Sequence, residues 1–313
     1  TYGDINNWDV SNITDFSSLF EGQINFNSDI SGWDVSSGTN FSSMFTDAEI
    51  FNSDISSWDV SSGTNFSSMF DGTTSFNKEI SGWDVSSGKN FSSMFDGTTS
   101  FKEDISGWYV NNGTDFSYMF YGASLFNQDI SGWDVSNGTD FSYMFNSASL
   151  FNQNINSWNV SNGTDFSWMF QNSVFNEDIS GWDVSNGTDF SYMFNEASLF
   201  NQDIGGWDVS NGTNFDVMFS GADLFDQNLS LWNVSNGTNF DNMFNNTLAS
   251  TNQGLASTPN ASYFDATSGD DAITGTADVD DALRGHDGND SLNGLGGNDT
   301  IFGDGGNDIL NGG

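Results

Sequence analysis

Apolar residues recur along the chain with a period of 25, in copies that resemble the segment "FNQDISGWDVSNGTDFSYMF" at 126–145. In this copy Trp133 and Val135 are two residues apart, the spacing of a short strand that turns one face to a core. Apolar residues in the segment 141–145 follow at i, i+3 and i+4, the spacing of one face of a helical turn. Each copy therefore predicts a short strand, a turn, a helical turn and a polar return loop.

Ten tryptophans mark the copies along the chain. They are Trp8, Trp33, Trp58, Trp83, Trp108, Trp133, Trp158, Trp182, Trp207 and Trp232. Every step is 25 residues except the one from Trp158 to Trp182, which is one residue shorter. A fixed period of 20–50 residues indicates a solenoid, a propeller or an array, and propeller blades need about 40 residues. Because a single copy cannot bury its own apolar face, the pattern predicts that residues 1–245 form ten stacked solenoid coils.

The same residues carry a resemblance to a known family. The pattern I-x-x-W-x-V followed by F-x-x-M-F is similar to the leucine-rich repeat and more closely resembles the BspA-like repeat of bacterial surface proteins. That family's 25-residue form, found in mycoplasma lipoproteins and marine bacteria, usually reads "WDVSNVTDMSYMF". Two departures stand out. Phe replaces the first Met, and Gly138 and its equivalents replace a Val, although the first copy keeps Ile13. The resemblance implies a leucine-rich-repeat-like solenoid of short parallel strands plus helical turns, with a looser turn at Gly138.

An acidic row is expected on the open face of such coils, at the residue between the two core positions of each strand. The row reads Asp9, Asp34, Asp59, Asp84, Tyr109, Asp134, Asn159, Asp183, Asp208 and Asn233. Parallel strands lie about 4.8 Å apart, so neighbouring carboxylates repel by roughly 0.9 kcal/mol per pair in water, and seawater-like salt removes most of this. The row is either a solvated face or a surface that binds cations or a partner.

Aromatic residues form a second row in four consecutive copies, where the first four copies carry Ser. This row consists of Tyr118, Tyr143, Trp168 and Tyr192. Its rings either stack on sugars or pack laterally between neighbouring coils.

Two further rows have simple structural explanations. A Thr row running from Thr14 to Thr238 allows an ice-binding interpretation, but Lys89 interrupts it and Thr139 or Asp140 also suits a helix N-cap. The Asn row that includes Asn27, Asn52 and Asn77 fits a ladder of amides between coils. The Asn-Gly-Thr triplets fit turns better than glycosylation sites.

A different repeat follows residues 246–267, which hold Pro259 and are expected to be a cap or linker. After them the period is nine, as in "GLGGNDTIFGDGGNDILNGG". Gly285, Gly294, Gly303 and Gly312 open successive units, Asp290, Asp299 and Asp308 hold the sixth place, and Leu292, Ile301 and Leu310 hold the eighth. Asp281 with Leu283 and Asp271 with Ile273 are degenerate copies.

This second repeat resembles the RTX, haemolysin-type pattern G-G-x-G-x-D-x-U-x, a calcium-binding parallel β-roll. Glycines let backbone carbonyls turn inward, aspartates add charge, and such hard oxygen ligands suit Ca²⁺. The resemblance predicts an incomplete β-roll over 268–313. It implies two nonapeptides per coil, which pairs Asp290 with Asp308 and Asp281 with Asp299. The candidate calcium site residues are Asp271, Asp281, Asp290, Asp299, Asp308, Gly288, Gly297 and Gly306. Asp287 in place of a Gly and the degenerate copies depart from the pattern, and His286 is expected to be a solvated loop residue.

Composition narrows the possible functions. The chain has 43 acidic and 4 basic residues, a net charge of −39 and no cysteine. This charge excludes nucleic acid and anionic membrane surfaces as partners, and the lack of cysteine excludes disulfides. No apolar run is long enough to span a membrane. The repeats begin and stop partway through a copy, so we expect a piece of a longer protein.

No catalytic constellation is recognisable, so the chain is not expected to be an enzyme. The leading hypothesis is a secreted or cell-surface bacterial repeat protein that is stabilised by calcium and acts as an adhesive scaffold. Its partner would be an unknown extracellular protein or glycan, and the RTX resemblance implies type I secretion. The alternative is a subunit of an extracellular filament or surface layer that assembles end to end. The binding-surface candidates are Asp34, Asp59, Asp84, Asp134, Asp183, Asp208, Tyr118, Tyr143, Trp168 and Tyr192.

Overall fold

The computed structural model describes residues 3–229, 231–234, 236–245, 247, 263–266, 269–275, 281–297 and 299–313. The chain forms two units, Thr1–Asn162 and Gly163–Gly313, and each is described here by itself. Of the expected cap or linker at 246–267 the structure describes only residues 247 and 263–266, and Tyr263–Asp265 form a strand. The rest lies outside the described residues, so the domain boundaries at 245 and 267 stay predictions.

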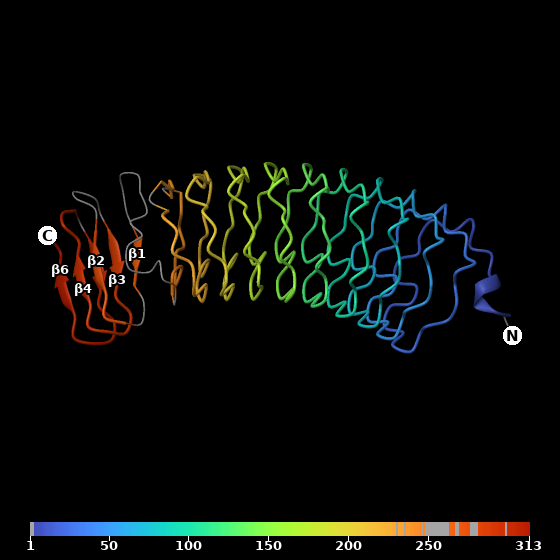
Figure 1. The fold of residues 1–313 in the computed structure, drawn as a ribbon, viewed down its shortest axis with the longest axis horizontal. Helices are drawn as coiled ribbons and strands as arrows, with labels where there is room; N and C mark the ends of the chain where they lie inside the picture. Colours follow the sequence, from blue (N-terminus) through green and yellow to red (C-terminus); the bar gives the residue numbers. More distant parts are fainter. Residues whose placement is uncertain are drawn as a thin grey trace. The chain divides into compact units, whose positions relative to one another are not determined.

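Within each unit, successive 25-residue copies lie side by side as coils joined by backbone hydrogen bonds (Figure 1). In the first unit Phe16 N donates to Asn40 O at 2.8 Å, and in the second Phe190 N donates to Asn214 O at 2.9 Å. Single-residue parallel bridges accompany these bonds. They join Asp15, Asn40, Asn65, Asn90, Asp115 and Asp140 in the first unit, and Asp165, Asp189, Asn214 and Asn239 in the second.

The strand predicted at Trp-x-Val does not form. Trp133 N donates to Ile130 O at 3.1 Å, and Gly138 N donates to Val135 O at 2.8 Å, so two consecutive tight turns use these backbone donors locally. A strand residue needs those groups for a neighbouring chain. Among the described 25-residue coils, the only parallel pairing is therefore the single bridge several residues further on.

The predicted helical turn at Phe-x-x-Met-Phe is also wrong. The one helix in the described residues is the 3₁₀ helix η1 (Ile5–Asn7). Tyr118 has a φ of 57°, in the left-handed region that a right-handed helix excludes. The N–H groups of Phe116, Tyr118 and Phe120 donate to the next coil, whereas Met119 N and Tyr121 N donate three residues back. Because every second donor leaves the coil, the segment ties neighbouring coils together.

The core predicted from the repeat is confirmed inside each unit. Trp33 and Trp58 stack with ring centroids 6.4 Å apart and planes 2° apart, and Phe45 and Phe70 stack at 5.7 Å. Trp58 is 3% exposed, and its Nε1 donates to Ile30 O of the preceding coil at 3.2 Å. Every coil thus covers the aromatic side chains of its neighbour, and the one polar atom of the indole is satisfied.

The two departures from the family pattern, Gly138 and Phe141, lie in close contact. A Cβ atom on Gly138 would lie 2.5 Å from Phe141 Cζ and 3.0 Å from Val135 O. The Phe ring therefore occupies the space that a larger residue at 138 would need. The turn is not left loose: Gly138 makes room for the aromatic column in which Phe116 and Phe141 stack at 5.8 Å.

The nine-residue coils form two three-stranded parallel sheets, as the β-roll prediction requires. One sheet pairs β1 (Tyr263–Asp265), β3 (Ala282–Arg284) and β5 (Thr300–Phe302), and the other pairs β2 (Ala272–Thr274), β4 (Ser291–Asn293) and β6 (Ile309–Asn311) (Figure 1). Strands 18 or 19 residues apart pair in parallel, so each coil contains two nonapeptides.

The core of these coils is thin. Ile273, Leu283 and Leu292 are buried together and Ile301 packs against them, whereas Leu310 is 49% exposed. The eighth position of the nonapeptide thus supplies the core as predicted, with small aliphatic side chains in place of the aromatic columns of the longer coils.

Candidate functional site

The aspartates of the nine-residue coils lie next to one another across the coils. Asp290 N donates to Asp308 Oδ1 at 3.0 Å, and Asp281 N donates to Asp299 Oδ1 at 2.9 Å. These are the two pairs that the RTX resemblance implies. The degenerate copy joins the same arrangement, because Asp271 N donates to Asp290 Oδ1 at 2.8 Å.

The second carboxylate oxygen of two of these aspartates has no partner. Asp290 Oδ2 and Asp299 Oδ2 are buried and accept no hydrogen bond from the described residues. Burial raises the pKa of Asp290, and the nearby carboxylates of Asp271, Asp308 and Asp270 raise it further. A buried, unpaired carboxylate is costly unless a proton or a cation neutralises it.

Glycines leave the space around these oxygens open. A Cβ atom on Gly285 would collide with Asp290 Oδ2 and would lie 2.9 Å from Gly303 O, so a carboxylate oxygen and a carbonyl oxygen converge there. On the other side of the roll, a Cβ atom on Gly275 would collide with Asp281 Oδ2 and would lie 3.0 Å from Gly294 O. Both places offer hard oxygen atoms of the kind that Ca²⁺ prefers.

The predicted glycines Gly288, Gly297 and Gly306 have φ values of 134°, 136° and 137°, which only glycine adopts readily. A Cβ atom on Gly306 would collide with Gly288 O. These glycines are required for the turn between strands.

Calcium fits the residues that are present. No group of three or more His, Asp or Glu side chains in the described ranges is placed to hold a metal, so a bound ion would draw on backbone carbonyls as well as carboxylates. The unpartnered oxygen of Asp290, with Gly303 O close by, offers that mixed set, and the unpartnered oxygen of Asp299 offers a second carboxylate ligand.

The acidic row of the 25-residue coils has a structural role. Asp34 Oδ1 accepts hydrogen bonds from Ser36 Oγ at 2.6 Å and from Ser36 N at 3.1 Å. These bonds lower the pKa of Asp34, although the like charges of Asp59 and Asp9 act to raise it. Asp59, Asp84, Asp134, Asp183 and Asp208 accept the N–H of the second residue after them in the same way. All six are exposed, and each closes a local turn.

The aromatic row packs along its own length. Tyr118 and Tyr143 stack at 4.2 Å, and Trp168 and Tyr192 stack at 3.8 Å, with each pair within 9° of parallel. All four side chains are half-buried and have φ values of 57–61°. Lateral packing, one of the two explanations considered above, therefore occupies ring faces that sugar stacking would need.

The Thr and Asn rows act as ladders between coils. Thr39 Oγ1 donates to Thr14 O at 3.1 Å, and Asn52 N donates to Asn27 Oδ1 at 2.8 Å. Asp140 Oδ1 accepts from Ser142 N at 2.9 Å, so this residue caps a turn and no helix follows it.

The sequence interpretation overlooked a group of carboxylates in the first unit. Burial, followed by the charge of Asp47, raises the pKa of Asp71 to about 6, and burial with the charge of Asp71 raises the pKa of Asp96 to about 7. The sequence signal was present, because the equivalent position in other copies holds donors such as Thr46 or Asn146.

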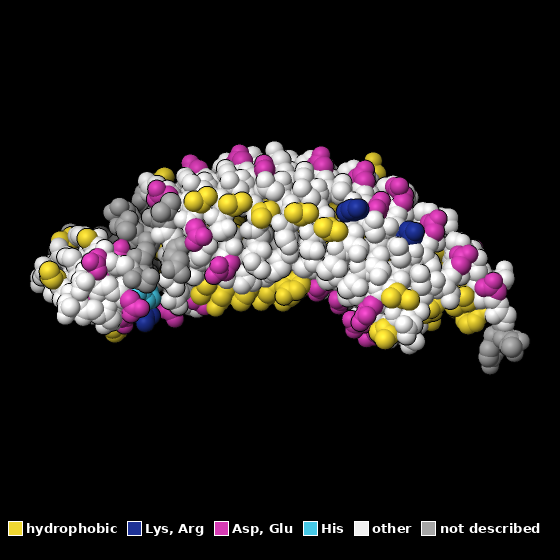
Figure 2. Space-filling view, turned by 60° about the horizontal axis from the view of Figure 1, so that its bottom comes forward, with side chains coloured by type: hydrophobic (Ala, Val, Ile, Leu, Met, Phe, Trp, Pro, Cys, Tyr) yellow, Lys and Arg dark blue, Asp and Glu magenta, His cyan; other side chains and the backbone are white. Residues whose placement is uncertain are grey.

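Figure 2 shows acidic side chains spread over the face in view and hydrophobic side chains gathered in rows.

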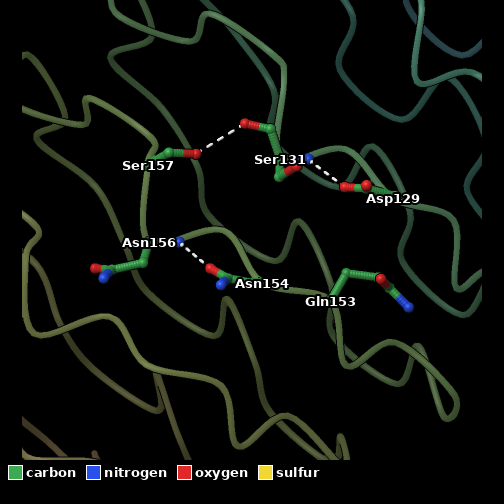
Figure 3. A pocket seen from close by; sticks show the side chains of 6 residues that line it. All are labelled: Asp129, Ser131, Gln153, Asn154, Asn156 and Ser157. Carbon is green, nitrogen blue, oxygen red and sulfur yellow. Dashed lines mark hydrogen bonds between the residues drawn. The ribbon is translucent and has the colours of Figure 1, made fainter.

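A polar pocket lies between neighbouring coils of the first unit (Figure 3). It is lined by Asp129, Ser131, Gln153, Asn154, Asn156 and Ser157. Ser131 N donates to Asp129 Oδ1 at 2.9 Å, which closes a local turn, and Ser157 Oγ donates to Ser131 O at 2.8 Å, which joins two coils. These polar groups of the pocket therefore hydrogen-bond to one another.

None of the described helices has the length and the apolar character needed to cross a membrane.

Comparison with protein families finds two matches. The model described as "Mycoplasma protein of unknown function, DUF285" matches residues 1–108, 79–174 and 164–257. The model described as "RTX calcium-binding nonapeptide repeat" matches residues 284–313. No curated protein and no solved structure matches the chain.

Proposed function

The chain belongs to the DUF285 family of Mycoplasma proteins of unknown function, and on that premise we propose that it is a non-enzymatic surface or secreted repeat protein that calcium stabilises. Its 25-residue coils form a BspA-like solenoid that presents an extended binding surface, and its RTX coils bind Ca²⁺. The observation that carries the proposal is the pair of buried, unpartnered oxygens of Asp290 and Asp299 inside the segment that matches the RTX repeat.

Calcium supplies the missing positive charge in this proposal. Asp290 and Asp299, on opposite sides of the roll, would each bind an ion through Oδ2, in the case of Asp290 together with a carbonyl of a neighbouring coil such as Gly303 O. The ion would offset the repulsion among Asp271, Asp290 and Asp308 that raises the pKa of Asp290. Because metal binding and folding are coupled, these coils would order only where calcium is abundant, as it is outside cells.

An extracellular location is consistent with the composition. A chain without cysteine cannot use disulfides as staples, and bound calcium replaces them. Type I secretion, which the RTX resemblance implies, would export the chain before calcium orders the coils. Cell fractionation tests this location. We expect the protein in the medium or on the protease-accessible surface, and recovery only from the cytosol would overturn it.

Isothermal titration with calcium chloride tests the ion site directly. We expect the double variant Asp290→Asn with Asp299→Asn to lose calcium binding by at least tenfold, because the amide cannot replace a charged ligand. The control is Asp34→Asn with Asp59→Asn, which removes the same net charge from exposed turns. Equal losses in both double variants would show diffuse attraction in place of a built site.

A second candidate is end-to-end assembly into a filament. The backbone hydrogen bonds and aromatic stacking that join neighbouring coils of this chain could also join coils of two copies. Electron microscopy of the purified protein with calcium decides between the candidates: fibres support the filament, and discrete particles support the scaffold.

A further inference from the structure

The row of residues with left-handed backbone conformation in the first unit changes from serine to tyrosine partway along. It holds Ser68 and Ser93 in two successive coils and then Tyr118 and Tyr143. Tyr118 stacks on Tyr143 through one ring face, with centroids 4.2 Å apart. On its other side the neighbouring position in the row is Ser93, which is too small to cover a ring. The aromatic stack therefore ends in a ring face that no aromatic side chain of the described residues covers.

A second aromatic ring lies beside the edge of this stack. Tyr121 lies at 43° to Tyr118 with centroids 5.8 Å apart, and at 52° to Tyr143 with centroids 6.4 Å apart. Tyr121 is 36% exposed, so the corner where it meets Tyr118 opens to solvent. The negative face of an aromatic ring attracts a cation, and two rings meet at this corner.

A carboxylate lies at the same corner. Asp96 occupies the position in its coil that Tyr121 occupies in the next, and Gly97 N donates to Tyr121 O at 2.8 Å, which joins the two coils there. The charge of Asp96 contributes to the raised pKa of Tyr118, after burial, so the two side chains are electrostatic neighbours. The Asp96 carboxylate is half-buried and accepts no hydrogen bond from the residues that the structure describes.

Among the described residues, no lysine or arginine forms an ion pair with Asp96. Asp71 and Asp47 continue the acidic group on one side, and Asp140 also faces Tyr118. The single salt bridge among the described residues joins Arg284 to Asp304, far along the sequence. The surface is therefore negative and aromatic at once, which fits an organic cation. A metal ion fits less well, because no three carboxylates of the described part come together.

We propose that the corner formed by Tyr118, Tyr121 and Asp96 binds the arginine side chain of a basic partner polypeptide. A guanidinium group is flat, stacks on an aromatic face and donates paired hydrogen bonds to a carboxylate, so it satisfies the ring and Asp96 together. A net charge of −39 draws a basic partner toward the chain and raises its rate of association.

This inference rests on the proposed role as a binding scaffold and adds the chemistry of the partner. Failure of the arginine site and failure of the calcium site are distinguishable, because arginine binding and calcium binding are measured separately on the same chain. A corner that fails to bind arginine leaves the calcium titration unchanged.

The probe is a fluorescein-labelled peptide of alternating glycine and arginine, titrated with the full chain in calcium and 150 mM salt and followed by fluorescence anisotropy. We expect Asp96→Asn and Tyr118→Ser each to weaken binding roughly tenfold, since a cation–π contact with a partly desolvated carboxylate contributes about 1–2 kcal/mol. Tyr118→Ser restores the residue found at position 93, so the fold tolerates it. Tyr118→Phe keeps the ring face and is expected to bind within twofold of the wild type.

The matched control is Asp29→Asn, which removes one exposed charge from a turn elsewhere in the first unit and should leave the affinity within twofold of the wild type. Equal weakening by Asp96→Asn and Asp29→Asn would overturn the proposal, since diffuse attraction would then explain the binding. Absence of binding by the wild type would overturn it as well. A peptide with lysine in place of arginine that binds as tightly would refute the assignment to arginine.

Discussion

The 25-residue coils and the 9-residue coils solve one problem in two ways. Both stack short units in parallel, and neither unit has enough apolar surface to be stable alone. The longer coil buries Trp, Phe, Met and Ile in columns, and its aspartates close turns at the surface. The shorter coils together bury a cluster of four aliphatic side chains, Ala266, Ile273, Leu283 and Leu292, and also carboxylate oxygens without partners. We therefore expect the first region to be stable through its own side chains, and we propose that the second needs a cation.

The use of aspartate shows this difference most clearly. Asp34 accepts hydrogen bonds from its own turn, which lower its pKa and keep it charged. Asp290 lies in a buried cluster of like charges that raises its pKa. One residue type thus closes turns in one region and forms a candidate ion site in the other.

The largest expected effect is on the aromatic column. We expect Trp133→Ala to lower the free energy of unfolding of the first unit by about 3–5 kcal/mol, because it leaves a cavity and an unpaired Ile105 carbonyl. Urea denaturation followed by circular dichroism measures this loss. Trp8→Ala is the control, since Trp8 is 46% exposed and has far less buried surface to lose. A loss under 1 kcal/mol at Trp133 would mean that the column is not the source of stability.

A smaller change in the free energy of unfolding is expected from the steric contact between Gly138 and Phe141. We expect Gly138→Val alone to cost about 1–3 kcal/mol, because its side chain would overlap the Phe141 ring. Phe141→Met should recover part of that cost, so a double-mutant cycle of urea denaturation should give a coupling energy of about 1 kcal/mol. Strict additivity of the two changes would refute the steric link.

The smallest expected effect is pH-dependent. The pKa of Asp96 is raised in the folded state to about 7, above its ordinary value, so the folded protein binds more protons than the unfolded chain between about pH 4 and 7 and loses stability as pH rises through this range. We expect Asp96→Asn to raise the melting temperature by a few degrees at pH 8, an advantage that fades toward pH 4. Asp34→Asn is the control. The pKa of Asp34 is lowered in the folded protein, so its replacement should give no such gain. A melting temperature of Asp96→Asn that equals that of the wild type at pH 8 would show that the group is fully solvated.

The period, the core and the aspartate pairs across coils could be predicted, because burial of an apolar face leaves few alternatives for the core and the RTX resemblance implies the pairs. The local backbone could not. The i, i+3, i+4 spacing of Phe116, Met119 and Phe120 is compatible with a helix, but it is equally compatible with a chain that alternates between right- and left-handed residues and sends every second N–H to the next coil. Propensity argues against Tyr118 in the left-handed region, and contacts between coils override that preference.

The Trp-x-Val segment was misread for a related reason. Alternation predicts a strand, but Ser and Gly around it form turns that use the backbone donors first. The Asp96 corner was missed because its residues come from two coils, and only stacking brings Asp96 beside Tyr121. The domain boundaries and the proposed binding residues still await a test.

The account rests on the claim that the 25-residue coils are stable without an ion and the 9-residue coils are not. Hydrogen–deuterium exchange of the full chain, with calcium and with a chelator, measures both regions in one experiment. We expect protection over Phe41–Phe219 under both conditions, and protection over residues 281–313 with calcium only. Protection of residues 281–313 that persists in chelator would contradict the account. Loss of protection throughout the 25-residue coils on removal of calcium would contradict it as well.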